Sequence, residues 1–369
     1  MPKPLRAYLE AQADRVEMVL SSHKASGRVT GGTVGPRLVR FFLDPAPNTR
    51  YSKIRRLTDD LALALRVSSL RVDRSEKGVV LEFDNPNPRP VSLLELLPQV
   101  MKDKHGQPDP LPTSTALLGL TDDGLPLLAR LASPQVAHVL ISGTTGSGKS
   151  VLLRAIAISL LLTHAESELR MICLDPKGRT FGAFAGAPHL LRPPVTEIPE
   201  ALEALRSLLR AMEVRDRRGE NTPCVAVLVD ELADLIFTGG DEVTESLTRL
   251  VQRGREAGIH VVAATQRPSS AIMTGLMRAN FPLRLVGKVV SANDARVATG
   301  RGGTDAHLLS GRGDFLAVGG GESDPLRFQV AYVGEQEIRD EINQLRRSSP
   351  SALPAPRSVV IDAEETVRR

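Results

Sequence analysis

Apolar residues in the first part of the chain follow helical and strand-like spacings in close succession. Over residues 5–22 they recur every three or four positions, which predicts an amphipathic helix that packs on its own domain. We then expect a strand at 37–43 and a helix at 52–67 that Ser52 caps. The mixture of periods indicates a unit of both helix and strand.

Two further strands are expected in this part, at 70–72 and 79–83. Residues 102–115 are polar and rich in proline, which indicates a domain boundary. We therefore predict a lead helix in residues 1–24 and a small α+β domain in residues 25–105.

Beyond the boundary, apolar runs alternate with helical stretches. Several runs contain only Val, Ile, Leu and Ala, which suits parallel strands buried on both faces. The helix expected at 151–162 is apolar nearly all round, so it should lie inside the domain. This pattern predicts an α/β nucleotide-binding fold over 106–340, with a mostly parallel sheet and the ligand at the carboxyl ends of its strands. A flexible tail is expected at 341–369. The predicted strands are 139–142, 170–174, 225–229, 259–264, 283–290 and 315–318.

The composition permits this reading and limits the choice of partners. The 369 residues are 41% hydrophobic and 24% charged, which allows a sizeable core and excludes disorder of the whole chain. Aromatic residues make up only 3%, with no Trp, which argues against a stacking platform for single-stranded nucleic acid. The net charge of +4 and the pI near 9.2 permit a basic surface facing DNA. Many proteins that never touch nucleic acid share this balance.

The two cysteines, Cys173 and Cys224, lie in or beside apolar strand-like runs. This context indicates small core residues and not a disulfide or a metal pair. No run approaches the ~20 apolar residues that a helix needs to span a bilayer. The first residues do not have the pattern of a signal peptide. We expect a cytoplasmic protein with no segment inserted in a membrane.

The motif GTTGSGKS, residues 143–150, follows an apolar strand and opens a helix. It matches the phosphate-binding pattern G-x-x-x-x-G-K-[ST], in which glycines let successive N–H groups point at the β-phosphate. We expect Lys149 to reach the β- and γ-phosphates of ATP and the Ser150 hydroxyl to bind Mg²⁺. The alternative is a glycine turn with no ligand. The predicted nucleotide-binding residues are Gly143, Thr144, Thr145, Gly146, Ser147, Gly148, Lys149, Ser150 and Val151.

A second signal is VAVLVDEL, residues 225–232, in which a buried strand delivers two carboxylates to its carboxyl end. Asp230 is suited to Mg²⁺ and its hydration shell, and Glu231 to orienting or deprotonating an attacking water. The pair favours hydrolysis over transfer to an acceptor, because the extra carboxylate serves water. Without a phosphate loop the same string would as often be an ordinary strand end.

Two more strand ends carry polar residues. Gln266 follows the strand IHVVAA, where its amide could bond the γ-phosphate, or simply end the strand. Residues 175–179, DPKGR, form a basic turn after another strand. That turn could face nucleic acid or only solvent.

Taken together, these motifs resemble the cytoplasmic motor of the FtsK/SpoIIIE family of double-stranded DNA translocases, within the FtsK–HerA group. The resemblance covers about residues 136–333 and runs through HVLISGTTGSGKS, LDPKGR, VAVLVDELADL, REAGIHVVAATQRPSSAIMTGLMRAN, FPLRLVGKVVSANDARVATG and LLSGRGDFL. The first part resembles the family's α domain through RFFLDPAPNTRYSKIRRLTDDLALAL and VVLEFDNPNPRPVSL. The resemblance implies a RecA-like P-loop NTPase fold.

The resemblance also implies a ring, expected to be a hexamer, with duplex DNA in its channel and ATP between neighbouring copies. Lys149, Ser150, Asp230, Glu231 and Gln266 would then act within one copy. Arg296, in SANDARVATG, occupies the position of the family's arginine finger and would act on the next copy's γ-phosphate. The alternatives are a surface ion pair at Arg296, and Arg301 in the finger's place.

By the same resemblance, DNA contacts would come from loops around 177–180 and 269–278. Basic loop residues are as often merely solvated. The residues suited to phosphate contact are Lys177, Arg179, Ser269, Ser270, Thr274 and Arg278.

The function implied is ATP-driven translocation of double-stranded DNA, as in chromosome segregation. One alternative is an FtsK-like ATPase of plasmid conjugation or protein secretion, although secretion relatives string several P-loop modules together and this sequence has one. Another is a nucleotide-gated clamp without turnover. The family's amino-terminal membrane helices and carboxy-terminal winged helix are not expected here. The chain would then be a truncated form, or a short plasmid, phage or mobile-element relative.

Overall fold

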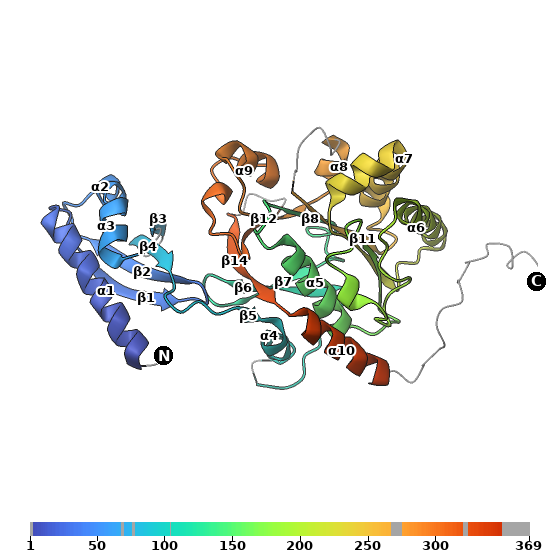
Figure 1. Cartoon of the computed structure of the whole chain (residues 1–369), viewed down its shortest axis with the longest axis horizontal. Helices are drawn as coiled ribbons and strands as arrows, with labels where there is room; N and C mark the ends of the chain where they lie inside the picture. The colour runs from blue at the N-terminus through green and yellow to red at the C-terminus, as the bar shows by residue number, and fades with distance from the viewer. Residues whose placement is uncertain are drawn as a thin grey trace, which may run out of the picture.

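The structure, a computed structural model, describes residues 3–67, 70–75, 78–103, 105–266, 275–319 and 324–348. Figure 1 shows a small N-terminal unit, residues 3–84, beside a large unit, residues 91–348. Each unit has a sheet of its own. The mixed α/β class and the small α+β region before it, both predicted from the sequence, are confirmed.

The N-terminal unit packs helices on an antiparallel sheet whose described strands run in the order β1-β2-β4-β3. The expected lead helix is present as α1, and it buries Val16 and Leu20 against Leu43 and Leu81 of the sheet. It therefore packs on its own unit, as predicted. The elements are α1 (Lys3–Ser22), β1 (Gly27–Val34), β2 (Leu38–Pro45), α2 (Tyr51–Arg56), α3 (Thr58–Leu65), β3 (Leu70–Ser75) and β4 (Gly78–Asp84).

The single helix expected at 52–67 is wrong in two respects. The helix begins at Tyr51 after an extended Arg50, so Ser52 lies inside the first turn and caps nothing. It also breaks at Leu57, where ψ is 11° and the Thr58 hydroxyl donates to the Arg55 carbonyl at 2.6 Å. Such local side-chain bonds compete with the helical ladder. The sequence also missed β1, because an exposed edge strand rich in glycine lacks apolar alternation.

The large sheet contains a parallel half that matches the sequence closely. Its strands run in the order β12-β8-β11-β10-β9, and every neighbouring pair is parallel. Along β10, Ala226 and Leu228 face one core, whereas Val225 and Val227 face the other, which explains the unbroken apolar run. The strands are β8 (Val139–Ser142), β9 (Leu169–Leu174), β10 (Cys224–Val229), β11 (Ile259–Thr265) and β12 (Leu283–Gly287).

The other half of this sheet is antiparallel, in the order β7-β6-β14-β13 next to β12. Only β13 was predicted. The sequence missed β6, β7 and β14; in β7 and β14, exposed positions interrupt the apolar run. These strands are β6 (Thr115–Thr121), β7 (Pro126–Arg130), β13 (Asp314–Val318) and β14 (Leu326–Tyr332).

Helices cover both faces of the large sheet. Helix α5 is buried on one face against β6 and β14, as its apolar sequence predicted, and α10 packs beside it. Helices α6 and α7 cover the opposite face (Figure 1). The remaining bounds are α4 (Leu93–Val100), α5 (Lys149–Thr163), η1 (Gly182–Phe184), α6 (Ile198–Arg218), α7 (Leu232–Arg253), α8 (Gly275–Ala279), α9 (Ala292–Thr299), η2 (Ala306–Leu308) and α10 (Glu335–Ser348).

The packing bears on both expected domain boundaries. Strand β5 (Val91–Ser92) pairs with β14, and α4 buries Leu93 and Leu97 in the core of the large unit. This favours a first boundary between 84 and 91 over one near 105. Helix α10 runs into the expected tail at 341–369, because Ile342 is buried on the same core.

Two further expectations can be compared with the fold. Cys173 and Cys224 are buried and free, and burial raises the pKa of both thiols. They are core residues, as predicted. Of the described helices, none combines the length and the apolar character needed to cross a bilayer.

Two buried histidines lie where β8 and β11 begin, at the end of these strands away from the phosphate loop. His138 accepts the Val261 N–H at 3.0 Å, and the His260 ring bonds the Ala137 carbonyl at 2.9 Å. Burial lowers the pKa of His138 to about 3 and also lowers that of His260.

These histidines make the fold sensitive to acid. Unfolded His138 takes up a proton near pH 6.5, whereas the folded side chain stays neutral until about pH 3. The unfolded state therefore binds more protons in this window, and stability falls as the pH falls. We expect His138 alone to cost about 2 kcal/mol of unfolding free energy between pH 7 and pH 5. Urea unfolding at both pH values tests this: His138→Gln should flatten the dependence and exposed His105→Gln should not. If the unfolding free energy of His138→Gln depended on pH as steeply as that of the wild-type chain, the prediction would be contradicted.

Candidate functional site

The loop between β8 and α5 has the backbone that the phosphate-binding motif requires. Gly143, Gly146 and Gly148 have φ of 152°, 79° and 109°. A Cβ at Gly148 would lie 2.8 Å from the Gly313 nitrogen, so this position lacks space for a side chain as well. The loop curls around the amino end of α5, where helix N–H groups face an anion.

Lys149 begins α5 and bends back over the loop. Its ammonium donates to the carbonyls of Gly143 at 2.9 Å and Thr144 at 3.0 Å, and the residue is only 8% exposed. Burial lowers the pKa of Lys149, and the nearby charges of Glu231 and Asp230 oppose this shift. The ammonium group is thus held against the backbone where the phosphate loop begins.

Ser150 and Asp230 meet beside Lys149. The Ser150 hydroxyl donates to Asp230 Oδ1 at 3.0 Å, and burial raises the pKa of Asp230. Asp230 directly follows β10, and its N–H donates to the Leu174 carbonyl of β9 at 3.1 Å. A hydroxyl beside a carboxylate is a pair of hard oxygen ligands, which is the chemistry that Mg²⁺ prefers. The donor set therefore fits this ion.

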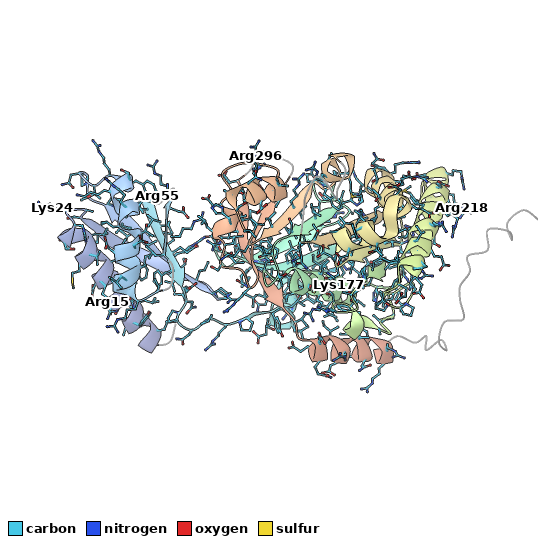
Figure 2. All side chains as sticks on the ribbon, turned by 45° about the horizontal axis from the view of Figure 1, so that its top comes forward. Arg15, Lys24, Arg55, Lys177, Arg218 and Arg296 are labelled. Carbon is cyan, nitrogen blue, oxygen red and sulfur yellow. The ribbon has the colours of Figure 1, made fainter. Side chains whose placement is uncertain are left out.

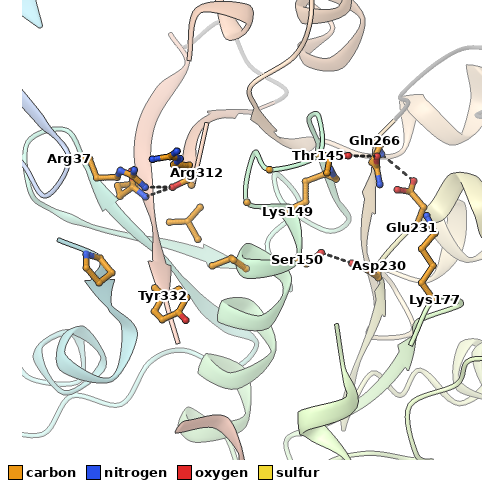
Figure 3. A pocket seen from close by; sticks show the side chains of 17 residues that line it. Arg37, Thr145, Lys149, Ser150, Lys177, Asp230, Glu231, Gln266, Arg312 and Tyr332 are labelled. Carbon is orange, nitrogen blue, oxygen red and sulfur yellow. Dashed lines mark hydrogen bonds between the residues drawn. The ribbon is translucent and has the colours of Figure 1, made fainter. Parts of the chain in front are cut away.

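Glu231 and Gln266 come from the ends of adjacent parallel strands. The Gln266 backbone N–H donates to Glu231 Oε1 at 3.1 Å, and the Thr145 hydroxyl donates to Gln266 Oε1 at 2.9 Å (Figure 3). Glu231 is 5% exposed. The structure thus brings the phosphate loop, both carboxylates and the amide together, as the sequence predicted.

These side chains line one cavity of about 450 Å³, which is large enough for a nucleotide. From the predicted loop, Gly143, Thr144 and Ser147 do not line it; the Thr144 hydroxyl instead donates to the Lys288 carbonyl. Among the lining residues outside the loop, the sequence singled out Lys177, Asp230, Glu231 and Gln266 and none of the others. Only the glycines of LLSGRGDFL hinted at a close backbone approach. The residues missed are Arg37, Pro90, Arg312, Gly313, Gln329, Val330 and Tyr332.

Lys177, predicted to contact DNA, lies at the rim of this same cavity. Its ammonium pairs with Asp234 at 2.5 Å, and this hydrogen bond raises the pKa of Lys177. Arg179 is exposed, as a DNA contact would require. The predicted contacts Ser269, Ser270 and Thr274 lie outside the described residues.

Arg296 lies on α9, apart from the nucleotide cavity and from Lys177 (Figure 2). It is exposed and lines a second cavity of about 500 Å³ together with Arg278 and Arg284. No acidic residue is among the described residues that line this cavity. The buried Nε of Arg278 has no hydrogen-bond partner, and burial and the charge of Arg278 lower the pKa of Arg284. Three guanidinium groups without a described counter-ion form a site suited to an anion.

Within the described residues the structure places no carboxylate in an ion pair with Arg296, so the surface-pair reading gains no support. Arg301 lies outside the lining of the second cavity. Arg278 was expected to contact DNA, and Arg296 was expected to contact a neighbour's nucleotide. Both residues line the second cavity.

A glycine-rich phosphate loop after the central parallel strand β8, with carboxylates after β10, the next strand but one in the sheet, defines a P-loop nucleotide-binding fold. The model of the FtsK/SpoIIIE family matches residues 113–218 and 214–270, and the model of the FtsK alpha domain matches residues 3–87. The chain belongs to the FtsK/SpoIIIE family. This confirms the resemblance of both parts.

Among curated proteins, the chain is similar to the DNA translocase FtsK of several bacteria. It is 34% identical over 394 residues to that of Sporosarcina ureae, covering 97% of this chain and 49% of the relative. The Listeria monocytogenes protein is 34% identical over 364 residues, with 91% and 47% covered. The chain thus spans about half the length of the curated relatives it matches.

Solved structures support the fold. The pCW3 conjugation coupling protein TcpA, in its monomer form with ATPγS, has a TM-score of 0.61 at 19% identity, with 91% of this chain and 99% of that chain covered. The cytoplasmic domain of the Thermomonospora curvata type VII secretion ATPase EccC has a TM-score of 0.56 at 24% identity, with 70% and 34% covered.

Proposed function

We propose that this chain is the motor part of a DNA translocase, which hydrolyses ATP and uses the energy to move duplex DNA. The observation that carries the proposal is the convergence of Lys149, Ser150, Asp230 and Glu231 on one nucleotide-sized cavity. A chain that only bound nucleotide would have no need of a second carboxylate beside the first. The nonenzymatic clamp is therefore disfavoured.

Each side chain has a role within one copy. The phosphate loop and Lys149 bind the β- and γ-phosphates; Ser150 and Asp230 would hold Mg²⁺, which would neutralise phosphate charge. Glu231 takes a proton from the attacking water. The Gln266 N–H fixes the Glu231 carboxylate, while Thr145 binds the Gln266 side-chain oxygen and leaves its NH₂ group for the γ-phosphate.

Arg296 lies outside the nucleotide cavity of its own copy, so we propose that it serves the cavity of a neighbour in a homo-oligomeric ring, expected to be a hexamer. The clustering of Arg278 and Arg284 around it supports an anionic partner such as a triphosphate. Head-to-tail contacts, which place one surface against a different one, form a ring when the rotation between neighbouring copies closes.

Double-stranded DNA is the proposed substrate, and the bacterial cytoplasm the proposed location. The support is that the relatives are named DNA translocases. The likeness to conjugation and secretion proteins concerns the fold and does not favour their substrates. Of the expected DNA contacts, Arg179, Ser269, Ser270 and Thr274 remain proposed. The positions of Lys177 and Arg278 instead favour contact with a nucleotide.

Phosphate release at rising salt, with and without long linear duplex DNA, tests the proposal. We expect duplex DNA to stimulate hydrolysis at about 50 mM salt and to lose this effect towards about 200 mM, because phosphate contacts release counter-ions. Single-stranded DNA should stimulate less. A rate that ignores duplex DNA at low salt would contradict the proposal and favour another substrate.

A further inference from the structure

Both units of the chain build the nucleotide cavity. Its γ-phosphate end is formed by Gln266 and Glu231, with Lys149 in the middle, and Figure 3 shows Arg37 and Tyr332 at the far end. Arg37 belongs to the N-terminal unit, directly before β2. The small unit therefore contributes a cation to a site that lies otherwise in the large unit.

Arg37 is connected to the phosphate loop through one backbone segment. Its Nη1 donates to the Arg312 carbonyl at 2.7 Å. The Arg312 N–H donates to the Gly146 carbonyl at 3.1 Å, and the Gly313 N–H to the Ser147 carbonyl at 2.7 Å. Segment 311–313 thus lies between Arg37 and the loop that receives phosphate.

The backbone of Arg37 is anchored. Its carbonyl accepts the Asn85 N–H at 2.7 Å, and the Asn85 side chain donates to the Gly35 carbonyl at 2.8 Å. Arg89 closes the same segment by donating its N–H to the Pro36 carbonyl at 2.9 Å. The backbone of Arg37 is therefore fixed where β2 begins.

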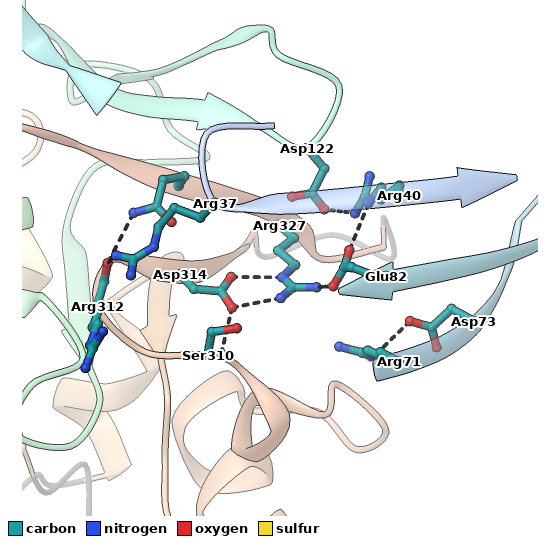
Figure 4. A network of polar contacts seen from close by, with 11 residues as sticks. Arg37, Arg40, Arg71, Asp73, Glu82, Asp122, Ser310, Arg312, Asp314 and Arg327 are labelled. Carbon is teal, nitrogen blue, oxygen red and sulfur yellow. Dashed lines mark hydrogen bonds and ion pairs between the residues drawn. The ribbon is translucent and has the colours of Figure 1, made fainter. Parts of the chain in front are cut away.

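A buried ionic network holds the two units together next to this segment (Figure 4). Arg327 of β14 bonds Asp314 at 2.8 Å and also pairs with Glu82 of β4, and Arg40 bridges Glu82 and Asp122. The side chains of Arg327, Glu82 and Asp314 are 11%, 6% and 6% exposed. Breaking such buried pairs is costly, so the network fixes the N-terminal unit beside the cavity.

The far end of the cavity suits a nucleoside. Val151 and the 47% exposed Tyr332 offer apolar and aromatic surface, and the guanidinium of Arg37 offers a flat cation with hydrogen-bond donors. Guanidinium planes stack on aromatic rings, and apolar walls accept a base. The lining residues Asp230 and Glu231 lie at the other end (Figure 3).

We propose that Arg37 contacts the nucleoside end of the nucleotide bound by its own chain, and that nucleotide binding thereby tightens the docking of the N-terminal unit. This proposal requires that the cavity binds a nucleotide, but it does not require that the nucleotide is hydrolysed. If nucleotide binding and docking of the N-terminal unit both depend on the position of Arg37, the two equilibria are coupled, and each must strengthen the other. The small unit then senses the occupancy of the cavity directly.

Calorimetric binding of two ligands, in the presence of Mg²⁺, tests the contact. One ligand is AMP-PNP, and the other is inorganic tripolyphosphate, which lacks the nucleoside. We expect Arg37→Ala to weaken AMP-PNP about tenfold and to leave tripolyphosphate unchanged. Arg55→Ala, at an exposed arginine of the same unit, should change neither. Unchanged AMP-PNP binding by Arg37→Ala, or equal losses for both ligands, would overturn the assignment.

Hydrogen exchange tests the docking. AMP-PNP should slow exchange of the Asn85, Asn87 and Arg89 backbone amides in the wild-type chain, and much less in Arg37→Ala at saturating ligand. Equal protection in both chains would overturn the coupling. If the unsubstituted chain bound neither ligand, the nucleotide site itself would have failed, which is a different result from the loss of the Arg37 contact alone.

Discussion

Glu231→Gln is expected to lower the rate of ATP hydrolysis by about 10²–10⁴-fold, the range in which a general base acts. The amide keeps an oxygen that can accept the Gln266 N–H, so the local structure should survive. It cannot take a proton from water. Nucleotide affinity should therefore stay close to that of the wild-type chain, and the protein should hold ATP without splitting it.

Steady-state phosphate release and calorimetric ATP binding measure the two effects separately. Glu245→Gln is a matched control, because Glu245 is exposed on α7, away from the cavity. It should leave both quantities unchanged. A Glu231→Gln chain that hydrolyses ATP at the wild-type rate would show that another group activates the water.

Arg296→Ala is expected to lower DNA-stimulated hydrolysis by about 10³-fold or more, the effect typical of an arginine supplied to a neighbour's γ-phosphate. Nucleotide binding to the chain's own cavity should be retained, because Arg296 does not line it. Exposed Arg218→Ala on α6 is the control and should behave as wild type.

Mixing inactive chains distinguishes a trans arginine from a structural one. In assemblies formed from equal amounts of Arg296→Ala and Glu231→Gln, about a quarter of the shared sites combine an intact Glu231 with an intact arginine. We expect such mixtures to regain activity on duplex DNA, although each variant alone is inactive. Mixtures that stay inactive after subunit exchange would argue against a shared site.

Residues that follow apolar strands were the easiest to predict. Asp230, Glu231 and Gln266 follow runs buried on both faces, and the carboxyl ends of parallel strands meet at one edge. The phosphate loop adds the glycine and lysine spacing of G-x-x-x-x-G-K-[ST], which few other local structures require. For these residues local sequence was enough to indicate a common site.

The far end of the cavity could not be predicted in this way. Tyr332 lies on a strand with weak alternation, and Arg37 belongs to a different unit and reaches the cavity only through the packing of the two sheets. The basic turn at Lys177 suggested a contact with nucleic acid. The ion pair of Lys177 with Asp234 of α7 could not be foreseen, because the two residues are distant in sequence. Each of these contacts depends on tertiary packing, which no local pattern encodes.

A structure of the chain assembled on duplex DNA with a slowly hydrolysed ATP analogue tests the proposed motor most directly. We expect a closed ring around the duplex, with Arg296 of each copy at the γ-phosphate in the next copy's cavity. Copies that hold the analogue while Arg296 faces solvent, or a duplex bound outside the ring, would contradict it.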